Sequence, residues 1–310
     1  MLRRLLVLVL LLIADHAGAA YEYRLISEEI APDIHVIQGS TEHFTLRNGG
    51  AIVNTAFIVT SAGVVVIDTG PSLNYGRAMR REIERVTNKP IVRVYNTHHH
   101  PDHFFGNQAF SDTPILALAA TRQAMRESAQ GLSDNLYRLL GPWMQGTEPH
   151  LPTANVEPGR SAVGDHEFET FAFNGHTAGD LAILDRLHGV LFAGDLVFND
   201  RAATTPNAEY GAWLASLRAL DKIDFRILVP GHGRVATSHA PITQTGAYLE
   251  WLNNTIDAAV RDGRSMAETL YVPIPADFSG MSAVNDEYRR SVMHWFPRTE
   301  QEMFERDTTR

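Results

Sequence analysis

The segment Asn96-Thr-His-His-His-Pro-Asp-His103 constrains this chain more than any other stretch. It follows directly on an apolar run that has the composition of a β-strand. His98 and His100 stand two positions apart, Asp102 follows after two more, and His103 comes next. In a loop that leaves a strand, this spacing lets the first two histidines converge on one point while the Asp–His pair turns toward a second. Imidazole and carboxylate groups are the ligands expected for zinc or a similar divalent ion.

Three later segments end strand-like runs with the same kinds of side chain. They are the Gly-containing stretches around His176, Asp195 and His232. One such residue alone is commonly a hydrogen-bonded turn residue, and the histidine cluster alone could be a solvated polar loop. Because these residues follow four potential ligands within six positions, the whole set indicates a metal centre instead.

The rest of the chain alternates between strand-like and helical patterns. β-Branched and aromatic residues predict strands at 34–37, 51–60, 64–67, 91–95, 168–173, 181–185, 190–193 and 226–229. Apolar periodicity predicts helices at 74–87, 117–128, 134–144, 209–220, 242–262 and 283–294. This order favours a layered α/β protein over a helical bundle. Each histidine motif falls just after a strand, where functional loops gather.

The ligand pattern resembles that of the metallo-β-lactamase superfamily, in which an H-x-H-x-D-H motif precedes a later His, a later Asp and a final His. The resemblance implies an αββα sandwich of two mixed sheets flanked by helices, spanning residues 20–310 with a helical C-terminal extension. It also implies two metal sites that share one bridging ligand: His98, His100 and His176 for the first, Asp102, His103 and His232 for the second, and Asp195 between them.

Two further assignments follow from the same resemblance. The residues of the first motif are taken as catalytic as well as metal-binding: His98, His100, Asp102 and His103. Asp68, at the end of the strand 64–67, resembles the carboxylate that orients a metal-bound histidine in these proteins.

A narrower resemblance covers most of the chain. The stretch His176-Thr-Ala-Gly-Asp-Leu-Ala182, the stretch Asp200 to Asn207 and the tail from Trp251 to Leu270 look like the quinoprotein relay system zinc metallohydrolases. These are secreted proteins found alongside quinoprotein dehydrogenases. The resemblance therefore implies zinc as the metal and a functional link to a quinoprotein dehydrogenase, and it does not disclose the substrate.

The ligand set itself favours hydrolysis. Two divalent cations outweigh two carboxylates and a bridging hydroxide, which leaves the centre at about +1. Such a centre lowers the pKa of bound water toward roughly 7 and polarises a carbonyl oxygen, so we expect metal-bound hydroxide to attack a small ester, thioester or lactone. β-Lactam hydrolysis is the alternative activity, although β-lactamases of class B resemble this site with Cys or Ser where Asp195 stands. A non-catalytic protein that binds metal or a small ligand is the third hypothesis.

The N-terminus predicts export. Arg3 and Arg4 precede an apolar run that is too short to span a bilayer, and Ala17-Gly18-Ala19 offers a cleavage site. We therefore interpret residues 1–19 as a signal peptide of a periplasmic or secreted protein, with an uncleaved membrane anchor as the alternative. The mature form is not expected to insert stably into a membrane.

Charge and cysteine content exclude other classes of function. Removing residues 1–19 removes two Arg and one Asp and takes the net charge from −9 to −10. A surface this acidic argues against nucleic acid as a partner and favours a small-molecule substrate. The chain has no cysteine, so the metal ligands are nitrogen and oxygen only.

Two histidines near the site are not assigned as ligands. His99 stands between two predicted ligands and is expected to point to the opposite side of the loop. His43 belongs to a Gly-containing stretch that could form a flap over the pocket, and we expect it to be an exposed loop residue instead.

Overall fold

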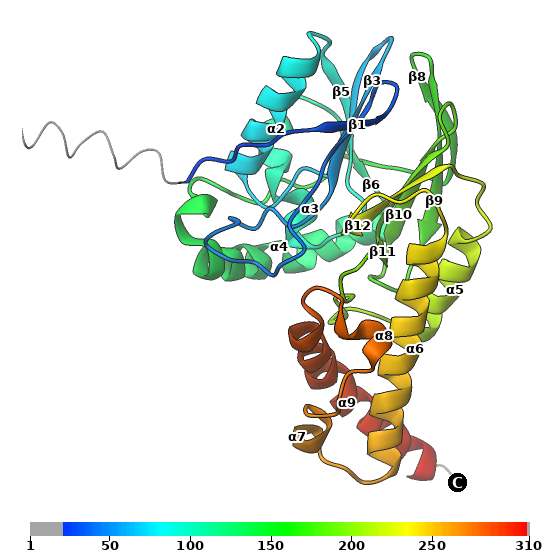
Figure 1. Ribbon diagram of the computed structural model, residues 1–310. Coiled ribbons are helices and arrows are strands. Elements are labelled where there is room, and N and C mark those ends of the chain that lie inside the picture. The colour runs from blue at the N-terminus through cyan, green and yellow to red at the C-terminus, as the bar shows by residue number, and fades with distance from the viewer. Residues whose placement is uncertain (1–20, 309–310) are drawn as a thin grey trace, which may run out of the picture.

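The computed structural model describes residues 21–308. The predicted signal peptide at residues 1–19 lies outside these residues. Two mixed β-sheets face each other, and helices cover their outer sides, which confirms the αββα sandwich (Figure 1). Among residues 21–308, no helix combines the length and the apolar composition needed to cross a bilayer.

The first sheet is formed by the N-terminal half of the chain, and its seven strands lie in chain order. They are β1 (Glu28–Ala31), β2 (Ile34–Ile37), β3 (Thr55–Thr60), β4 (Gly63–Ile67), β5 (Ile91–Tyr95), β6 (Ile115–Ala117) and β7 (Ala154–Asn155). The pairs from β1 to β4 are antiparallel and those from β4 to β7 are parallel. Because β4 and β5 run in parallel, they end at the same edge of the sheet, next to Asp68 and the histidine segment.

The second sheet has the strand order β12-β11-β10-β9-β8. Its members are β8 (Gly159–Val163), β9 (His166–Phe173), β10 (Asp180–Asp185), β11 (Val190–Phe198) and β12 (Ile227–His232). Only β11 and β12 are parallel, and they carry two of the predicted ligands near their carboxyl ends. All nine residues of β11 are buried, as expected for a strand that is covered on both faces.

Apolar side chains of both sheets fill the space between them. Alternate residues of β2, β3 and β4 meet alternate residues of β9, β10 and β11 in one buried cluster, which includes Val36, Ile58, Val65, Phe168, Ile183 and Phe192. This shared core holds the two sheets in place against each other. The loops at the ends of the strands are therefore also held in place relative to one another.

Helices cover the outer faces and extend the chain beyond the sandwich. They are α2 (Leu73–Val86), α3 (Pro101–Phe104), α4 (Ala119–Leu140), α5 (Tyr210–Leu220), α6 (Ala240–Arg261), α7 (Met266–Thr269), α8 (Ala276–Ser279) and α9 (Val284–Thr308), with short 3-10 helices at Phe105–Phe110 and Gly141–Met144. In Figure 1 the segment from α6 to α9 projects past the ends of the sheets.

The prediction of two helices at 117–128 and 134–144 was wrong, because α4 is one continuous helix that ends at Leu140. Its buried residues, among them Met125, Ala129 and Ser133, recur at helical spacing straight through the middle of the segment. Gly131 lies on the open side of this helix. Packing along the buried face thus overrides the cost of about 1 kcal/mol that a glycine adds to a helix interior.

Candidate metal centre

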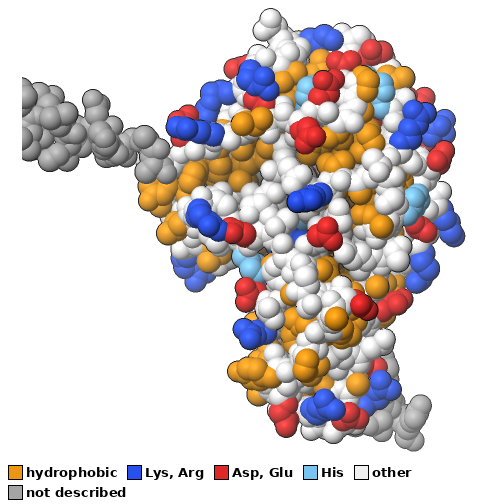
Figure 2. All heavy atoms as spheres, viewed as in Figure 1, with side chains coloured by type: hydrophobic (Ala, Val, Ile, Leu, Met, Phe, Trp, Pro, Cys, Tyr) orange, Lys and Arg blue, Asp and Glu red, His pale blue; other side chains and the backbone are white. Residues whose placement is uncertain are grey.

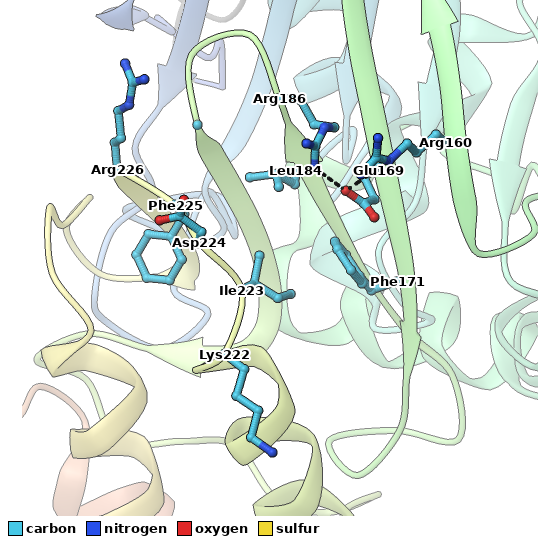
Figure 3. A pocket seen from close by; sticks show the side chains of 11 residues that line it. Arg160, Glu169, Phe171, Leu184, Arg186, Lys222, Ile223, Asp224, Phe225 and Arg226 are labelled. Atoms are coloured by element: carbon cyan, nitrogen blue, oxygen red, sulfur yellow. Dashed lines mark hydrogen bonds and ion pairs between the residues drawn. The ribbon is translucent and has the colours of Figure 1, made fainter.

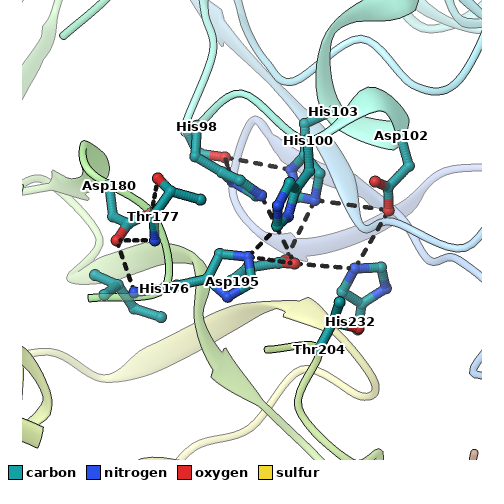
Figure 4. A network of polar contacts seen from close by, with 12 residues as sticks. His98, His100, Asp102, His103, His176, Thr177, Asp180, Asp195, Thr204 and His232 are labelled. Atoms are coloured by element: carbon teal, nitrogen blue, oxygen red, sulfur yellow. Dashed lines mark hydrogen bonds and ion pairs between the residues drawn. The ribbon is translucent and has the colours of Figure 1, made fainter. Parts of the chain in front are cut away.

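All seven predicted ligands come together in two neighbouring groups, carried by β11, β12, α3 and the segments that follow β5 and β9 (Figure 4). The segment after β5 leads into α3, which carries Asp102 and His103, while β11 carries Asp195 and β12 ends on His232. Gly231 makes this approach possible, because a Cβ atom there would lie 1.9 Å from Oδ1 of Asp195. The glycine of the Pro-Gly-His segment thus lets two neighbouring strands bring their ligands together. We call these seven residues the ligand wall.

The first group of potential ligand atoms comes from His98, His100, His176 and Asp195, all of them buried. Nδ1 of His100 lies 2.9 Å from Nε2 of His176. Oδ2 of Asp195 lies 3.4 Å from the same nitrogen of His176 and 3.7 Å from Nε2 of His98. Three imidazoles and one carboxylate therefore point at a common centre, as the sequence predicts for the first metal site.

The second group consists of Asp102, His103 and His232. Nε2 of His232 lies 3.3 Å from Oδ2 of Asp102 and 3.3 Å from Oδ2 of Asp195. Oδ1 of Asp195 lies 3.2 Å from Nε2 of His103. Asp195 thus contacts members of both groups, which is the place that a bridging ligand would need.

Asp68 fixes the orientation of two histidines. Its carboxylate lies 2.7 Å from Nδ1 of His103, and it accepts hydrogen bonds from the backbone N–H of Thr97 at 2.8 Å and from the Thr97 hydroxyl at 2.7 Å. The same hydroxyl oxygen lies 3.1 Å from Nδ1 of His98. Asp68 has a φ of 55°, a left-handed conformation that aspartate tolerates better than most residues. The predicted role of Asp68 beside a ligand agrees with this geometry.

Two further histidines are held by partners that sequence reasoning missed. Nε2 of His100 lies 3.0 Å from Oδ1 of Asn207, and Nδ1 of His232 lies 2.7 Å from the carbonyl oxygen of Ile52. An N–H that donates to either oxygen leaves the other ring nitrogen as an acceptor for a cation. Asn207 lies in the stretch 200–207 that supported the narrower resemblance, but nothing in the sequence points from this residue to His100.

The donor set fits two divalent cations. Nε2 of His98, Nε2 of His103 and Oδ1 of Asp195 are buried and have no hydrogen-bond partner. Buried polar atoms are normally paired, and four of the five histidines already use their other nitrogen for a protein partner. Nitrogen and oxygen donors suit zinc and related metals. The structure therefore contains two candidate metal sites, and the role of each residue as a ligand stays a prediction.

Burial and charge set the protonation of the centre. Burial lowers the pKa of His98 and of His176 well below the ordinary value, so both are neutral imidazoles. Burial acts to raise the pKa of Asp102, but the charge of His103 and the hydrogen bond to His232 outweigh it and hold this pKa at about 2. His103 shows the opposite balance: burial lowers its pKa, but the carboxylates of Asp195 and Asp68 raise it well above the ordinary range. The clustered carboxylates thus create a negative potential that attracts a cation.

The turn that carries His176 is held by Asp180. This carboxylate accepts hydrogen bonds from the backbone N–H of His176 at 3.1 Å and from the hydroxyl of Thr177 at 2.7 Å. Burial raises the pKa of Asp180 to about 7, against the lowering effect of these hydrogen bonds. The motif His176-Thr-Ala-Gly-Asp180 is therefore a turn that closes on its own first residue.

A cavity of about 100 Å³ opens over the ligand wall. Phe44, Ile52 and Leu132 form its apolar side. The cavity is also lined by Arg201 and by two residues of α9, Glu287 and Arg290. We call Glu287 and Arg290 the helical wall. Sequence reasoning missed it, because α9 lies far from every motif in the chain.

The expectation for His43 was wrong. Its side chain is only 32% exposed, and it lies 3.5 Å from carboxylate oxygens of both Asp286 and Glu287. His43 thus lines the cavity beside the helical wall, because α9 packs against the segment that carries it. His99 belongs to neither group of ligand atoms, as expected, but it is buried, and burial lowers its pKa to about 3.

A second cavity, of about 410 Å³, lies elsewhere on the second sheet (Figure 3). Arg160 and Arg186 flank Glu169 there. Nη1 of Arg186 donates a hydrogen bond to Oε2 of Glu169 at 2.6 Å, and Nε of Arg160 lies 3.5 Å from the same oxygen. Lys222 and Phe225 line the other side. None of the lining residues is a histidine or belongs to the ligand wall. Both groups of potential metal ligands therefore lie away from this cavity.

The family model of the metallo-beta-lactamase superfamily matches residues 48–232, more than half of the 310 residues. The chain therefore belongs to the metallo-β-lactamase superfamily. Members of this superfamily are mostly metal-dependent hydrolases. The matched segment ends at His232, so α6 to α9, including the helical wall, follow it in the chain.

Individual relatives are distant or match only in part. A linear primary-alkylsulfatase of Pseudomonas sp. is 40% identical over 83 residues, 26% of this chain and 15% of that protein. A hydroxyacylglutathione hydrolase of Rhodospirillum rubrum is 29% identical over 139 residues, 45% of this chain and 46% of that protein. The chain thus spans less than half the length of these two curated relatives. A solved metallo-beta-lactamase from Pontibacter korlensis has a TM-score of 0.61 at 20% identity and covers 73% of this chain and 99% of that one, which shows the fold alone.

Proposed function

We propose that this protein is an exported, zinc-dependent hydrolase of small acyl compounds: esters, thioesters or lactones. The observation that carries the proposal is the position of Asp195, whose two oxygens face both groups of potential ligands. A carboxylate in that place can hold two cations close to one another. The proposal adds a reaction and a substrate class to the superfamily membership.

The residues of the site have separate tasks. The ligand wall holds the cations, Asp68 keeps Nε2 of His103 turned toward them, and Asn207 does the same for Nδ1 of His100. Two bound divalent ions supply Lewis acidity and lower the pKa of a water molecule at the site. Phe44, Ile52 and Leu132 keep bulk water away from one side of the cavity.

The size of the cavity limits the substrate. The cavity has a volume of about 100 Å³, which is below the roughly 300–1,000 Å³ of a typical small-molecule pocket. This space admits a short acyl group, while a larger leaving group would extend into solvent. The similarity to a hydroxyacylglutathione hydrolase supports a thioester or ester as the reacting bond.

Export and the quinoprotein link are parts of the same proposal. The Arg-Arg pair, the apolar run and Ala17-Gly18-Ala19 support export, and the stretch Asp200 to Asn207 supports the link to a quinoprotein dehydrogenase. Fractionation of producing cells, with N-terminal sequencing of the protein, tests the first. A mature form that keeps residues 1–19 and remains in the cytoplasm would contradict it. Co-purification with a quinoprotein dehydrogenase and the growth of a deletion strain on alcohols test the second. Absence of both an association and a growth defect would contradict the link.

One panel of substrates tests the reaction. Metal-quantified protein is incubated with chromogenic esters, thioesters, lactones, a cephalosporin and single-stranded RNA. The proposal expects metal-dependent turnover of acyl substrates that exceeds turnover of the cephalosporin, and none of RNA. Preferred cephalosporin turnover would make β-lactam hydrolysis the function, and a two-metal protein inactive on the whole panel would favour a binding protein.

A further inference from the structure

Arg290 of the helical wall contributes a cation to the lining of the cavity. Arg290 lines the cavity together with Asp102 and Asp195 of the ligand wall. Its side chain is 45% exposed, and the closest charged group is Oε1 of Glu287, 4.0 Å from Nη1. This separation is too long for a hydrogen bond, and within residues 21–308 the guanidinium makes none. Its donors are therefore available to a ligand.

Neighbouring charges do not neutralise Arg290. Glu287 is fully buried, and its Oε1 accepts a hydrogen bond from the Thr204 hydroxyl at 2.8 Å and lies 3.5 Å from the buried guanidinium of Arg201. Its negative charge is thus balanced by Arg201. Asp286, the other acid nearby, lies 3.5 Å from His43 and is 68% exposed, so solvent screens its charge. Of the two arginines that line the cavity, Arg201 lies 3.5 Å from Glu287, whereas Arg290 has no carboxylate within hydrogen-bond distance in the described part of the chain.

We infer that Arg290 recognises a carboxylate on the substrate, at the end of the acyl chain away from the reacting carbonyl. This inference rests on the proposed function and specifies its substrate class: short dicarboxylic monoesters or monothioesters. A guanidinium presents a planar fork of donors that matches the two oxygens of a carboxylate. Arg290 and residues of the ligand wall line the same cavity of about 100 Å³, so the substrate that we infer carries a short acyl chain between its two ends.

The charge of the whole protein makes this position selective. The chain carries a net charge of −9, and acidic and basic side chains are interspersed over the face seen in Figure 2. A small anion is therefore not attracted by the surface at large and gains most beside Arg290 and the cations of the metal centre. A substrate with the same acyl chain but no terminal carboxylate lacks the contact with Arg290. The quantity to measure is therefore how strongly the protein prefers a substrate with the carboxylate over one without it.

The test compares mono-4-nitrophenyl glutarate with 4-nitrophenyl butyrate. A charge-assisted hydrogen-bonded pair contributes enough binding energy for roughly 10- to 100-fold discrimination, so the ratio of kcat/KM for glutarate over butyrate should fall at least about 10-fold in Arg290→Gln. Arg290→Lys should lie between the two, because it keeps the charge and loses the fork. Arg289→Gln is the matched control: it removes the adjacent arginine of α9, which does not line the cavity, and should leave the ratio unchanged.

Failure of the proposed function can be told apart from failure of this inference. If the wild-type protein hydrolyses no ester, thioester or lactone of the panel, the proposed function fails. The inference is then tested by titrating the metal-loaded wild-type protein and both glutamine variants with glutarate and with butyrate. A preference for glutarate that is lost in Arg290→Gln and kept in Arg289→Gln supports the carboxylate contact. Equal ratios in all three proteins, by either readout, would overturn it.

Discussion

The two walls of the cavity are built in different ways. In the ligand wall, hydrogen-bonding partners hold the outer nitrogen of His98, His100, His103 and His232, so each inner nitrogen faces the centre. In the helical wall, Oε2 of Glu287 has no hydrogen-bond partner, and Nη1 of Arg290 lies 4.0 Å from Oε1 of Glu287, too far for a hydrogen bond. Protein partners therefore orient four of the five histidines of the ligand wall, whereas the guanidinium of Arg290 in the helical wall makes no hydrogen bond within residues 21–308.

On this account the ligand wall serves the chemistry of the site, and the helical wall serves its selectivity for substrates. A fixed set of nitrogen and oxygen donors suits a pair of cations that must stay in one geometry. The helical wall follows the segment matched by the superfamily model and contributes no residue to either group of potential ligands. Substitutions should therefore affect metal retention strongly in the first wall and hardly at all in the second.

Asp195→Ala should have the largest effect on metal retention. It removes the carboxylate that faces both groups, so we expect metal affinity and any hydrolytic activity to fall by more than about 100-fold. His99→Ala is the matched control, because His99 is buried beside the site and belongs to neither group. Elemental analysis after dialysis measures the outcome. Similar metal contents of the two variants would show that the loop after β5 is assigned wrongly.

Asp68→Ala should come next. The carboxylate orients His103 directly and His98 through Thr97, and loss of such a partner typically costs roughly 10- to 100-fold in metal affinity or activity. Competition with a chromophoric chelator measures the affinity. Asp68→Asn keeps an oxygen acceptor and should lose less. An alanine variant with wild-type affinity would mean that Asp68 serves only the backbone turn.

Asn207→Leu should have a smaller effect, of roughly 10-fold and confined to the first site. The leucine leaves Nε2 of His100 without its acceptor, and the ring can then turn its nitrogens away from the centre. Asn207→Asp keeps an acceptor oxygen and should hold both ions. Cobalt substitution reports the two sites by their absorption spectra. An unchanged spectrum in the leucine variant would rule out a role for Asn207 in positioning His100.

Glu287→Gln should have the smallest effect on metal retention and leave both sites filled. It should instead lower the free energy of unfolding by about 3 kcal/mol, because it leaves the buried Arg201 without its counter-charge. Asp286→Asn is the control, since its exposed pair with His43 should contribute less than about 1 kcal/mol. Denaturant titration and metal analysis on the same samples separate the two quantities. Metal loss in Glu287→Gln would mean that the two walls are not independent.

The ligand wall could be predicted from the sequence because short motifs at strand ends determine it. The spacing of His98, His100 and Asp102, together with the apolar runs before each motif, indicated a metal centre, and the superfamily resemblance implied how the seven residues divide between two sites. The superfamily resemblance also supplied Asp68 and the αββα sandwich.

The remaining parts depend on contacts between distant segments, which no local pattern records. Asn207 meets His100 across 107 positions of the chain, and His43 meets Glu287 because α9 folds back over the cavity. Helix α4 likewise continues past Gly131 because one of its faces is buried against the rest of the protein. The sequence pattern alone predicted two separate helices there.

The metal content of the purified protein tests the central claim most directly. Elemental analysis of protein reconstituted with zinc and freed of excess metal should give about two ions per chain, and about two again when cobalt replaces zinc. A value below roughly half an ion per chain would contradict the account, because a complete and buried set of seven donors should not stay empty.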